Sequence, residues 1–534
     1  MIIFVKKIMP TDCITYQKSG YFSKLIVDYL DEKPVIQSLY HRFPTLENFA
    51  TQVDEKAKNY SLENRFTLVE ALKNQYVNFP VSEATQTNIE LLKSEKTFTI
   101  TTGHQLNLFT GPAYFLYKIA STINLCQQLK EAYSEYNFVP VYWMATEDHD
   151  FEEINHFNLK GKKIKWERES FGPVGRLSTE GLKEVFEEFS KIIGVGETAT
   201  YLKEVFRKSY LEHNNLADAT RFLANELFSE EGLVIIDGDD KNLKTLFAPY
   251  IKEELLHQNS FVQVSKTLQQ LKDYTVQVNP REINLFYIED HLRERIIFEN
   301  NTYKVNNTEI QFSESEIIDL VENSPEKFSP NVILRPLYQE VILPNLAYIG
   351  GGGEIAYWLE LKSNFEVQKV TFPIIMLRNS FVVATEKQIG KMEKLQLSWS
   401  DLFLSQQELI HKKTKEVSIF NIDFSEQKET LRKQFAELLR IAEQTDKSFM
   451  GAVKAQEVKQ IKGLENLEKR LLKAEKRVHI EKINHIIALQ NQLFTNGSLQ
   501  ERKNNFSEFY SKKFKNDVIL LSNPLNTYFK IIKI

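Results

Sequence analysis

The chain has 534 residues, which is more than a single hydrophobic core usually serves, so we expect about two or three domains. Aromatic residues make up 12% of the sequence, which excludes global disorder. The net charge of −5, from 67 basic and 72 acidic residues, points to neither a nucleic acid nor a membrane as a partner.

The cysteine content and the length of the apolar runs limit the cellular compartment in which we expect the protein. Cys13 and Cys126 are the two cysteines, so a disulfide framework and a cysteine-rich zinc site are both excluded. The apolar run at residues 1–5 is too short for a secretory signal, and no later stretch is long and apolar enough to span a bilayer. We therefore expect a cytoplasmic protein.

A strand, a helix and a second strand follow a mostly helical region that covers residues 1–95. Residues 97–102 are β-branched and aromatic, residues 113–123 have apolar positions at helical spacing, and residues 137–144 form the next apolar run. This order predicts a βαβ unit with parallel strands. The polar residues that follow each strand would then lie at the same edge of a sheet.

The remaining core elements are separated by two predicted insertions. Further core strands are expected at residues 233–236, 332–334, 346–349 and 374–377, and a helix at 246–256. Residues 275–278, 285–288 and 295–298 read as small antiparallel strands of an insertion. We predict an α/β core over residues 1–380 with insertions at about 157–230 and 257–330, and a segment at 497–534 that returns to the core.

Residues 381–496 are expected to form a separate helical domain. Gly and Pro become rare there, and apolar residues recur at spacings of three and four, as a coiled-coil seam requires. The predicted seam residues are Ile461, Leu464, Leu467, Leu471, Ala474 and Val478.

His104 follows a glycine at the predicted end of the first strand and precedes a helix. Backbone N–H groups at such a place favour an anion, and a neutral or protonated imidazole there could stabilise a phosphate or an oxyanion. The alternative is a histidine that only caps a neighbouring backbone group.

The acidic cluster Glu147, Asp148, His149 and Asp150 follows the second strand. It could supply a general base, or metal ligands together with His156. Side chains on an extended segment alternate in direction, so at most two of the four would face one site. An acidic turn that neutralises basic residues of the insertion is the competing interpretation.

Glycines and arginines mark two further candidate positions. The glycines at 350–353 indicate positive φ or a close backbone approach before a helix at Glu354, without the spacing of a dinucleotide motif or the lysine of a P-loop. Arg335 and Arg378 each follow a predicted core strand and suit a bidentate carboxylate, with surface salt bridging as the alternative.

Several motifs together resemble the bacillithiol biosynthesis family BshC. They lie at residues 102–105, 109–112, 172–176, 334–336, 350–354, 377–380 and 499–502, and the stretch EDHDFEEINH at 147–156 is the most specific. The resemblance covers nearly the whole chain. It implies a Rossmann-like core, two connective insertions, a coiled-coil domain that forms a homodimer, and a ligase that adds L-cysteine to the amine of glucosaminyl-malate.

The resemblance also assigns roles to individual residues. It implies His104, Asp148 and His149 as catalytic, with no metal, and a nucleotide such as ATP or ADP near Gln500, Arg502 and Asn505. Distant kinship with cysteinyl-tRNA synthetase places His104 at a signature histidine, but two cysteines cannot supply the zinc site of those relatives.

Two alternative functions stay open. One is a non-catalytic scaffold that binds a nucleotide or a sugar acid, and the other is a metal-dependent hydrolase. The expected substrate-binding residues are Gln105, Asn107, Tyr117, Lys118, Asp150, Arg335, Gly351, Gly352, Glu354 and Arg378.

Overall fold

The computed structural model describes residues 14–445 and 447–534, so Cys13 and the apolar run at residues 1–5 lie outside the described residues. The chain divides into two compact units. The larger unit consists of Thr15–Val383 and Gln500–Ile532, and the smaller unit is built mainly from Ala384–Leu499. None of the helices in the described part of the chain is long and apolar enough to cross a membrane.

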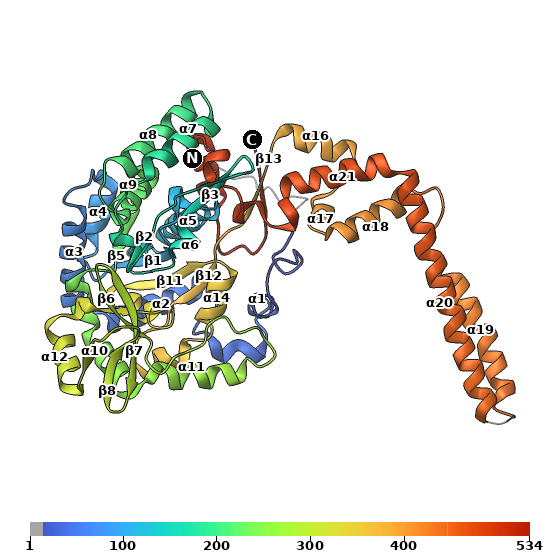
Figure 1. The fold of residues 1–534 in the computed structure, drawn as a ribbon, viewed down its shortest axis with the longest axis horizontal. Coiled ribbons are helices and arrows are strands. Elements are labelled where there is room, and N and C mark those ends of the chain that lie inside the picture. Colours follow the sequence, from blue (N-terminus) through green and yellow to red (C-terminus); the bar gives the residue numbers. More distant parts are fainter. Residues whose placement is uncertain (1–13, 446) are drawn as a thin grey trace. The chain divides into compact units, whose positions relative to one another are not determined.

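A parallel five-stranded sheet forms the centre of the larger unit (Figure 1). Its strand order is β12-β11-β1-β2-β5, and every neighbouring pair is parallel. The predicted strands at 97–102, 137–144, 233–236, 346–349 and 374–377 are confirmed. Their bounds are Thr97–His104 (β1), Asn137–Met144 (β2), Val234–Asp237 (β5), Asn345–Gly350 (β11) and Ile374–Leu377 (β12).

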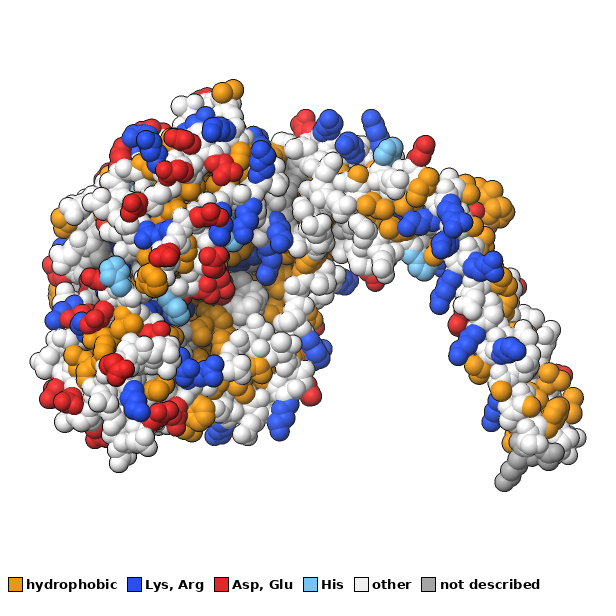
Figure 2. All heavy atoms as spheres, viewed as in Figure 1, with side chains coloured by type: hydrophobic (Ala, Val, Ile, Leu, Met, Phe, Trp, Pro, Cys, Tyr) orange, Lys and Arg blue, Asp and Glu red, His pale blue; other side chains and the backbone are white. Residues whose placement is uncertain are grey.

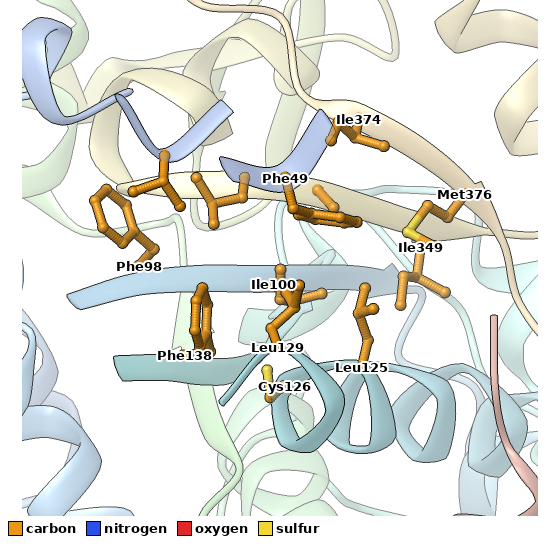
Figure 3. Close-up of a cluster of buried hydrophobic side chains, with 13 residues drawn as sticks. Phe49, Phe98, Ile100, Leu125, Cys126, Leu129, Phe138, Ile349, Ile374 and Met376 are labelled. Carbon is orange, nitrogen blue, oxygen red and sulfur yellow. The ribbon is translucent and has the colours of Figure 1, made fainter. Parts of the chain in front are cut away.

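The buried strands pack against two helices, α2 (Leu46–Asn59) and α5 (Tyr114–Ala132). All of β1 is buried, as expected for a central strand of a parallel sheet. Figure 3 shows side chains from α2, α5 and the strands meeting in one cluster, which includes Phe49, Ile100 and Leu125. Removing so much apolar surface from water is the main stabilising term for this unit.

Further helices surround the sheet, and side-chain caps fix where several of them begin. Ser61 accepts a hydrogen bond from the backbone N–H of Asn64 at the start of α3, and Ser82 accepts one from Thr85 at the start of α4. These helices are α1 (Lys24–Leu30), α3 (Leu62–Tyr76), α4 (Glu83–Leu91), α10 (Lys241–His257), α13 (Arg335–Ile342), α14 (Gly352–Trp358) and α15 (Lys362–Val367).

Two insertions interrupt the sheet. The first contains the hairpin β3 (His156–Leu159) and β4 (Lys162–Lys165) and the helices α7 (Leu182–Ile193), α8 (Glu197–Leu211) and α9 (Leu216–Phe228). The second contains an antiparallel sheet in the order β10-β6-β7-β8-β9. Its elements are α11 (Asn259–Gln270), β6 (Leu285–Glu289), β7 (Leu292–Glu299), β8 (Thr302–Val305), β9 (Gln311–Phe312), α12 (Glu314–Asn323) and β10 (Phe328–Pro330).

Two predicted strands are wrong. Residues 275–278 have no regular structure, and residues 332–334 form a turn that leads into α13. The side chain of Asn331 accepts hydrogen bonds from the backbone N–H groups of Ile333 and Leu334, and Pro336 supplies the fixed φ suited to a first helical turn. Arg335 therefore begins a helix and does not end a strand.

The segment after residue 499 completes the larger unit. Helix α22 (Lys512–Leu521) packs on α5, and β14 (Lys530–Lys533) pairs with β13 (Phe381–Ala384). The Gln500 amide accepts a hydrogen bond from the backbone N–H of Val383 and donates one to its carbonyl oxygen.

The smaller unit is helical and contains an antiparallel pair, α19 (Ser425–Ala442) and α20 (Lys447–Val478), shown in Figure 1. Phe435, Ala442 and Val453 form a buried cluster between these two helices, and Lys428 of α19 pairs with Glu468 of α20. The other helices are α16 (Glu386–Lys394), α17 (Trp399–Leu402), α18 (Gln406–Val417) and α21 (Ile480–Leu493).

The predicted seam of α20 divides into two sets. Ile461, Leu464 and Leu471 are half-buried, whereas Leu467, Ala474 and Val478 are exposed. Figure 2 shows apolar side chains on the surface of this helical pair, between lysines and arginines.

Candidate functional site

A cleft of about 660 Å³ lies at the carboxyl ends of the parallel strands. Strands β2 and β5 lie on one side of β1, and β11 and β12 lie on the other, so the chain reverses direction across the sheet between β1 and β11. Open parallel sheets bind ligands at such a switch point. Gly103 and His104 from β1, and Tyr348 from β11, line the cleft at this point.

His104 is the last residue of β1, not part of a turn, and it is buried. Its ring packs edge-on against Tyr114 and at a tilt against Phe115. Burial, with help from the Lys118 ammonium, lowers the pKa of His104 to about 3. Nε2 lies 3.4 Å from the carbonyl oxygen of Thr110, which can only accept, so Nε2 carries the single proton of a neutral ring.

An ion pair joins the two sides of the switch point. The Lys118 ammonium, on α5, donates to the carbonyl oxygen of Gly103 at 2.7 Å and lies 2.6 Å from Glu354, on α14. Glu354 also accepts from the Tyr348 hydroxyl and from the backbone N–H of Gly351. Burial alone would raise the pKa of Glu354, but Lys118 and these donors lower it.

The glycines after β11 serve close packing. None of the residues 350–353 has positive φ. A Cβ on Gly350 would lie 2.9 Å from Cβ of Glu354, so a side chain there would displace the carboxylate that holds Lys118. Of the two possibilities that the sequence left open, close approach is the correct one.

The acidic cluster and the end of β1 share one rim. The Gln105 amide donates to Asp148 and to Glu153, both at 2.9 Å, and the backbone N–H of His149 donates to the other oxygen of Asp148. Gln105, Asp148 and His149 all line the cleft. The structure thus brings together the residues that the predicted βαβ unit placed at one edge.

The other acidic residue of the cluster that lines the cleft is paired, and two further candidate residues lie outside the cleft. Glu147 lines the cleft but pairs with the buried ammonium of Lys244. Asp150 is exposed and His156 begins β3, and neither lines the cleft. His156 bonds to Asn155 through Nδ1. Glu147, Asp148 and His149 thus all line the cleft, so the prediction that at most two of the four cluster residues face one site is wrong. Residues 146 and 147 form a turn, which breaks the alternation of an extended segment.

His149 is held by an arginine that the sequence did not single out. The Arg293 guanidinium lies 2.6 Å from Nδ1 of His149 and stacks over the ring of Phe286. A guanidinium only donates, so Nδ1 accepts and the ring proton is on Nε2. Burial and the positive charge of Arg293 lower the pKa of His149.

Arg335 reaches the cleft from the first turn of α13. Its guanidinium lies over the rings of Trp143 and Tyr348, and one nitrogen donates to Gln339 at 3.0 Å. The other terminal nitrogen, Nη2, is buried without a hydrogen-bond partner. An unsatisfied buried donor at a cleft wall is costly unless a ligand accepts from it.

The second insertion adds further residues that sequence reasoning missed. Asn279, Arg281, Arg293 and Arg295 line the cleft, as does Tyr114 of α5. In the sequence, Arg293 and Arg295 show only the two-residue spacing of one strand face. That spacing identifies a shared face but not what the face covers.

Several expected substrate residues lie outside the cleft. Tyr117 is buried against Phe381, and Asn107 donates to the backbone carbonyl of Glu153. Arg378 is buried and pairs with Glu501 at 2.7 Å. Gly351 and Gly352 border α14 but do not line the cleft.

The expected nucleotide residues are separate from the cleft as well. The Asn505 amide donates to the carbonyl oxygens of Phe109 and Gly111, and the Gln500 amide is bonded to Val383. Arg502 is exposed. A nucleotide at this place would have to displace backbone hydrogen bonds that two of the three side chains already make.

Among the described residues, no three His, Cys, Asp or Glu side chains are close enough together to hold a metal ion. Asp148, His149 and His156 therefore do not form the ligand set on which the hydrolase alternative depends.

Comparison with known proteins assigns the chain to a family. Residues 9–379 match the model of the bacillithiol biosynthesis BshC N-terminal Rossmann-like domain, and residues 381–534 match its C-terminal coiled-coil domain. Relatives from Flavobacterium psychrophilum, Flavobacterium johnsoniae and Christiangramia forsetii are 65%, 63% and 56% identical. Each match covers 98% of this chain and 99% or more of the relative, and each relative bears the name "Putative cysteine ligase BshC".

A solved structure described as an arginyl-tRNA synthetase from Campylobacter jejuni matches 79% of this chain and all of its own at 11% identity, with a TM-score of 0.20 that carries no argument about fold. The family models and the full-length relatives agree with each other and with the parallel sheet and helical unit described above. The chain belongs to the bacillithiol biosynthesis BshC family, a family of ligases.

Proposed function

We propose that this ligase joins the carboxyl group of L-cysteine to the amine of glucosaminyl-malate, forming the amide bond of bacillithiol. The observation that carries the proposal is the composition of the cleft. It holds a carboxylate, Asp148, without a cationic side chain bonded to it, and arginines without a carboxylate partner. Amide synthesis with a dicarboxylic substrate needs both a proton acceptor and binding sites for negative charge.

Asp148 is the proton acceptor in this proposal. The attacking amine must lose its proton, and the Asp148 carboxylate is partly exposed to the cleft and oriented by Gln105 and the His149 backbone. Nδ1 of His149 is occupied by Arg293, so His149 offers the Nε2 proton to the developing oxyanion.

His104 has a different role from the one that the sequence suggests. A neutral ring whose single proton points to Thr110 has no proton left for an oxyanion. In this proposal the His104 ring packs against Tyr114 and so holds the end of β1, and its Nδ1 can accept a hydrogen bond.

Lys118, Arg335 and Arg378 are the basic residues among those expected to bind substrate, and of the three Arg335 is the one without an ion-pair partner among the described residues, so it is available to a carboxylate of either substrate. Lys118 is paired with Glu354, and Arg378 is paired with Glu501. The unpartnered Nη2 of Arg335 faces no acidic neighbour within hydrogen-bond distance among the described residues.

The carboxyl group of cysteine must lose an oxygen when the amide forms. A nucleoside triphosphate would supply this activation by carrying the oxygen away on phosphate. The experiment therefore incubates purified protein with glucosaminyl-malate and cysteine, with and without ATP, and detects bacillithiol by mass spectrometry. Product in either arm supports the ligase, and its absence in both arms contradicts the proposal and favours a non-catalytic scaffold.

A matched pair of variants locates the chemistry. Asp148→Asn should lower kcat by at least about a hundredfold, as loss of a general base does. Asp150→Asn makes the same change two residues away, outside the cleft, and should retain activity within about twofold. Equal activity of the two variants would remove Asp148 from the role.

We propose in addition that the protein works as a cytoplasmic homodimer through α19 and α20. Leu438 and Ile441 on α19, and Leu467 and Val478 on α20, are 44% to 71% exposed. The latter two are 11 residues apart, about three helical turns, and so lie on one face. Exposed apolar side chains at such spacing are typical of a helix that is covered by a second copy.

A further inference from the structure

Arg281 and Arg295 line the cleft, and neither guanidinium has a hydrogen bond or an ion pair with any described residue. Nε of Arg295 is buried without a partner. Arg295 has therefore lost part of its hydration without gaining a protein acceptor, which costs stability, whereas Arg281 is exposed and its guanidinium is available to a ligand. Both residues come from the second insertion and not from the parallel sheet.

Strand β7 concentrates positive charge on the face toward the cleft. Arg293 and Arg295 are two residues apart, so they share one face at a spacing of about 7 Å. The partners of Arg293 are the Ser329 hydroxyl, the Pro330 carbonyl and His149, none of which is negatively charged. Two neighbouring cations without a bonded carboxylate repel each other unless an anion binds between them.

The acidic residues of the cleft neutralise this face only in part, because Glu147 and Asp148 lie near Arg293 but are bonded to other groups. Glu147 is paired with Lys244, and Glu354 is paired with Lys118. Asp148 accepts from Gln105 and from a backbone N–H. After these pairings the wall formed by the insertion retains a surplus of positive charge, which suits a ligand with two negative charges.

We propose that Arg281 and Arg295 bind the two carboxylates of the malyl group, and so set the preference of the enzyme for a dicarboxylate. The inference rests on the proposed function and refines it. The planar fork of arginine matches a carboxylate in a bidentate way. Phosphates in parallel sheets bind instead at glycine-rich strand ends and helix N-termini, which here belong to β11 and α14.

Binding of L-malate to the full-length protein tests the proposal without any catalytic step. Arg281→Met and Arg295→Met should each raise the Kd for L-malate, measured by isothermal titration calorimetry, by about tenfold, and the double variant should raise it further. Arg295→Lys keeps the charge but loses the fork and should fall between wild type and Arg295→Met.

Two controls make the result specific. Lys304→Met removes one positive charge from the neighbouring strand β8, outside the cleft, and should leave the Kd unchanged. The monocarboxylate L-lactate should bind wild type at least about tenfold more weakly than L-malate, and this difference should vanish in the double variant. Circular dichroism and the unfolding midpoint of each variant show whether it is folded.

Three results would overturn the proposal: L-malate binding that survives in the folded double variant, equal affinity of wild type for L-malate and L-lactate, or displacement of L-malate by inorganic phosphate that depends on the same arginines. The third result would identify a phosphate site.

Kinetics separate this inference from the proposed function. In the ligase assay the KM for glucosaminyl-malate should rise by about tenfold in each arginine variant while kcat stays within about twofold, since the contacts bind substrate and transition state alike. Product formation with unchanged KM would refute the role of the arginines alone. No product from wild type, together with arginine-dependent L-malate binding, would refute the ligase and leave the dicarboxylate site standing.

Discussion

At the residue scale, the protonation of the site follows from what each side chain touches. His104 and His149 each have one nitrogen committed to a neighbour, Thr110 in the first case and Arg293 in the second. Burial lowers the pKa of both rings. Near neutral pH both histidines of the cleft are therefore neutral, and Asp148 has no cationic side chain bonded to it. This arrangement suits removal of a proton from an amine.

The low pKa of His104 predicts a dependence of stability on pH. Between pH 6.5 and 3 the unfolded chain binds a proton at this residue and the folded chain does not, so stability falls as the pH falls through this window. From pH 7.5 to pH 5 the loss from this residue amounts to about 2 kcal/mol.

The variant His104→Gln has no such proton to bind. Its free energy of unfolding, measured by urea denaturation, should lose about 2 kcal/mol less than that of wild type over the same range. Parallel pH curves for the two proteins would show that His104 titrates normally in the folded state.

The buried pair Arg378 and Glu501 predicts a stability effect. Glu501→Gln leaves the Arg378 charge in the interior without its carboxylate and should cost about 3–5 kcal/mol. The coupling is measured with wild type, Arg378→Met, Glu501→Met and the double variant of these two substitutions. The double variant should be less destabilised than the sum of Arg378→Met and Glu501→Met. Denaturation of the four proteins measures this coupling, and strict additivity would mean that the two side chains do not interact.

The positions of Tyr114 and Tyr117 show how far sequence reasoning reaches at this scale. Both residues lie on the predicted helix, and the rim shared by Gln105 and Asp148 follows from the parallel strands alone. Which tyrosine faces the cleft depends on the rotation of α5 against the sheet. Packing of the whole core determines that rotation, so the sequence points to Tyr117 as a substrate-binding residue, whereas in the structure Tyr114 lines the cleft.

At the element scale, predictions succeeded where the period of apolar residues and the turn residues agreed. Strands β1, β2 and β11 are buried, rich in β-branched, aromatic or aliphatic residues, and followed by polar residues or glycines. Residues 332–334 have the same composition over a shorter length, but the Asn331 side chain caps the turn and a helix follows. The arginines of β7 could not be assigned, because the sequence does not show over which surface an insertion folds.

The pair α19 and α20 should unfold locally when its small cluster is damaged. Phe435→Ala removes the largest buried side chain of that cluster and should cost about 3 kcal/mol. Hydrogen exchange should become faster at amides of α20 and remain unchanged at amides of β1. Phe420→Ala, an exposed phenylalanine of the same unit, is the control and should alter neither.

At the scale of the whole molecule, the proposed dimer predicts a change in mass. One chain has a mass of 62.4 kDa, and we expect twice that value in sedimentation equilibrium. Leu467→Glu and Val478→Glu place a charge on exposed apolar positions of α20 and should shift the protein to the mass of one chain.

Val195→Glu is the matched control for this experiment, because Val195 is 96% exposed and lies in the larger unit. It should leave the mass unchanged. A wild type that sediments at 62.4 kDa at micromolar concentration would contradict the dimer.

The larger unit is completed by Gln500–Ile532, a segment that follows the smaller unit in the sequence, and this order affects folding during translation. Gln500, Glu501 and Asn505 supply hydrogen bonds to β13, to Arg378 and to the loop after β1, yet they leave the ribosome after the helices of the smaller unit. Until then the nascent chain holds Arg378 without its counter-charge and the Phe109 carbonyl without its donor. We expect translation to finish before the larger unit becomes resistant to proteases, so ribosome-bound chains stalled before residue 500 should be cleaved within that unit.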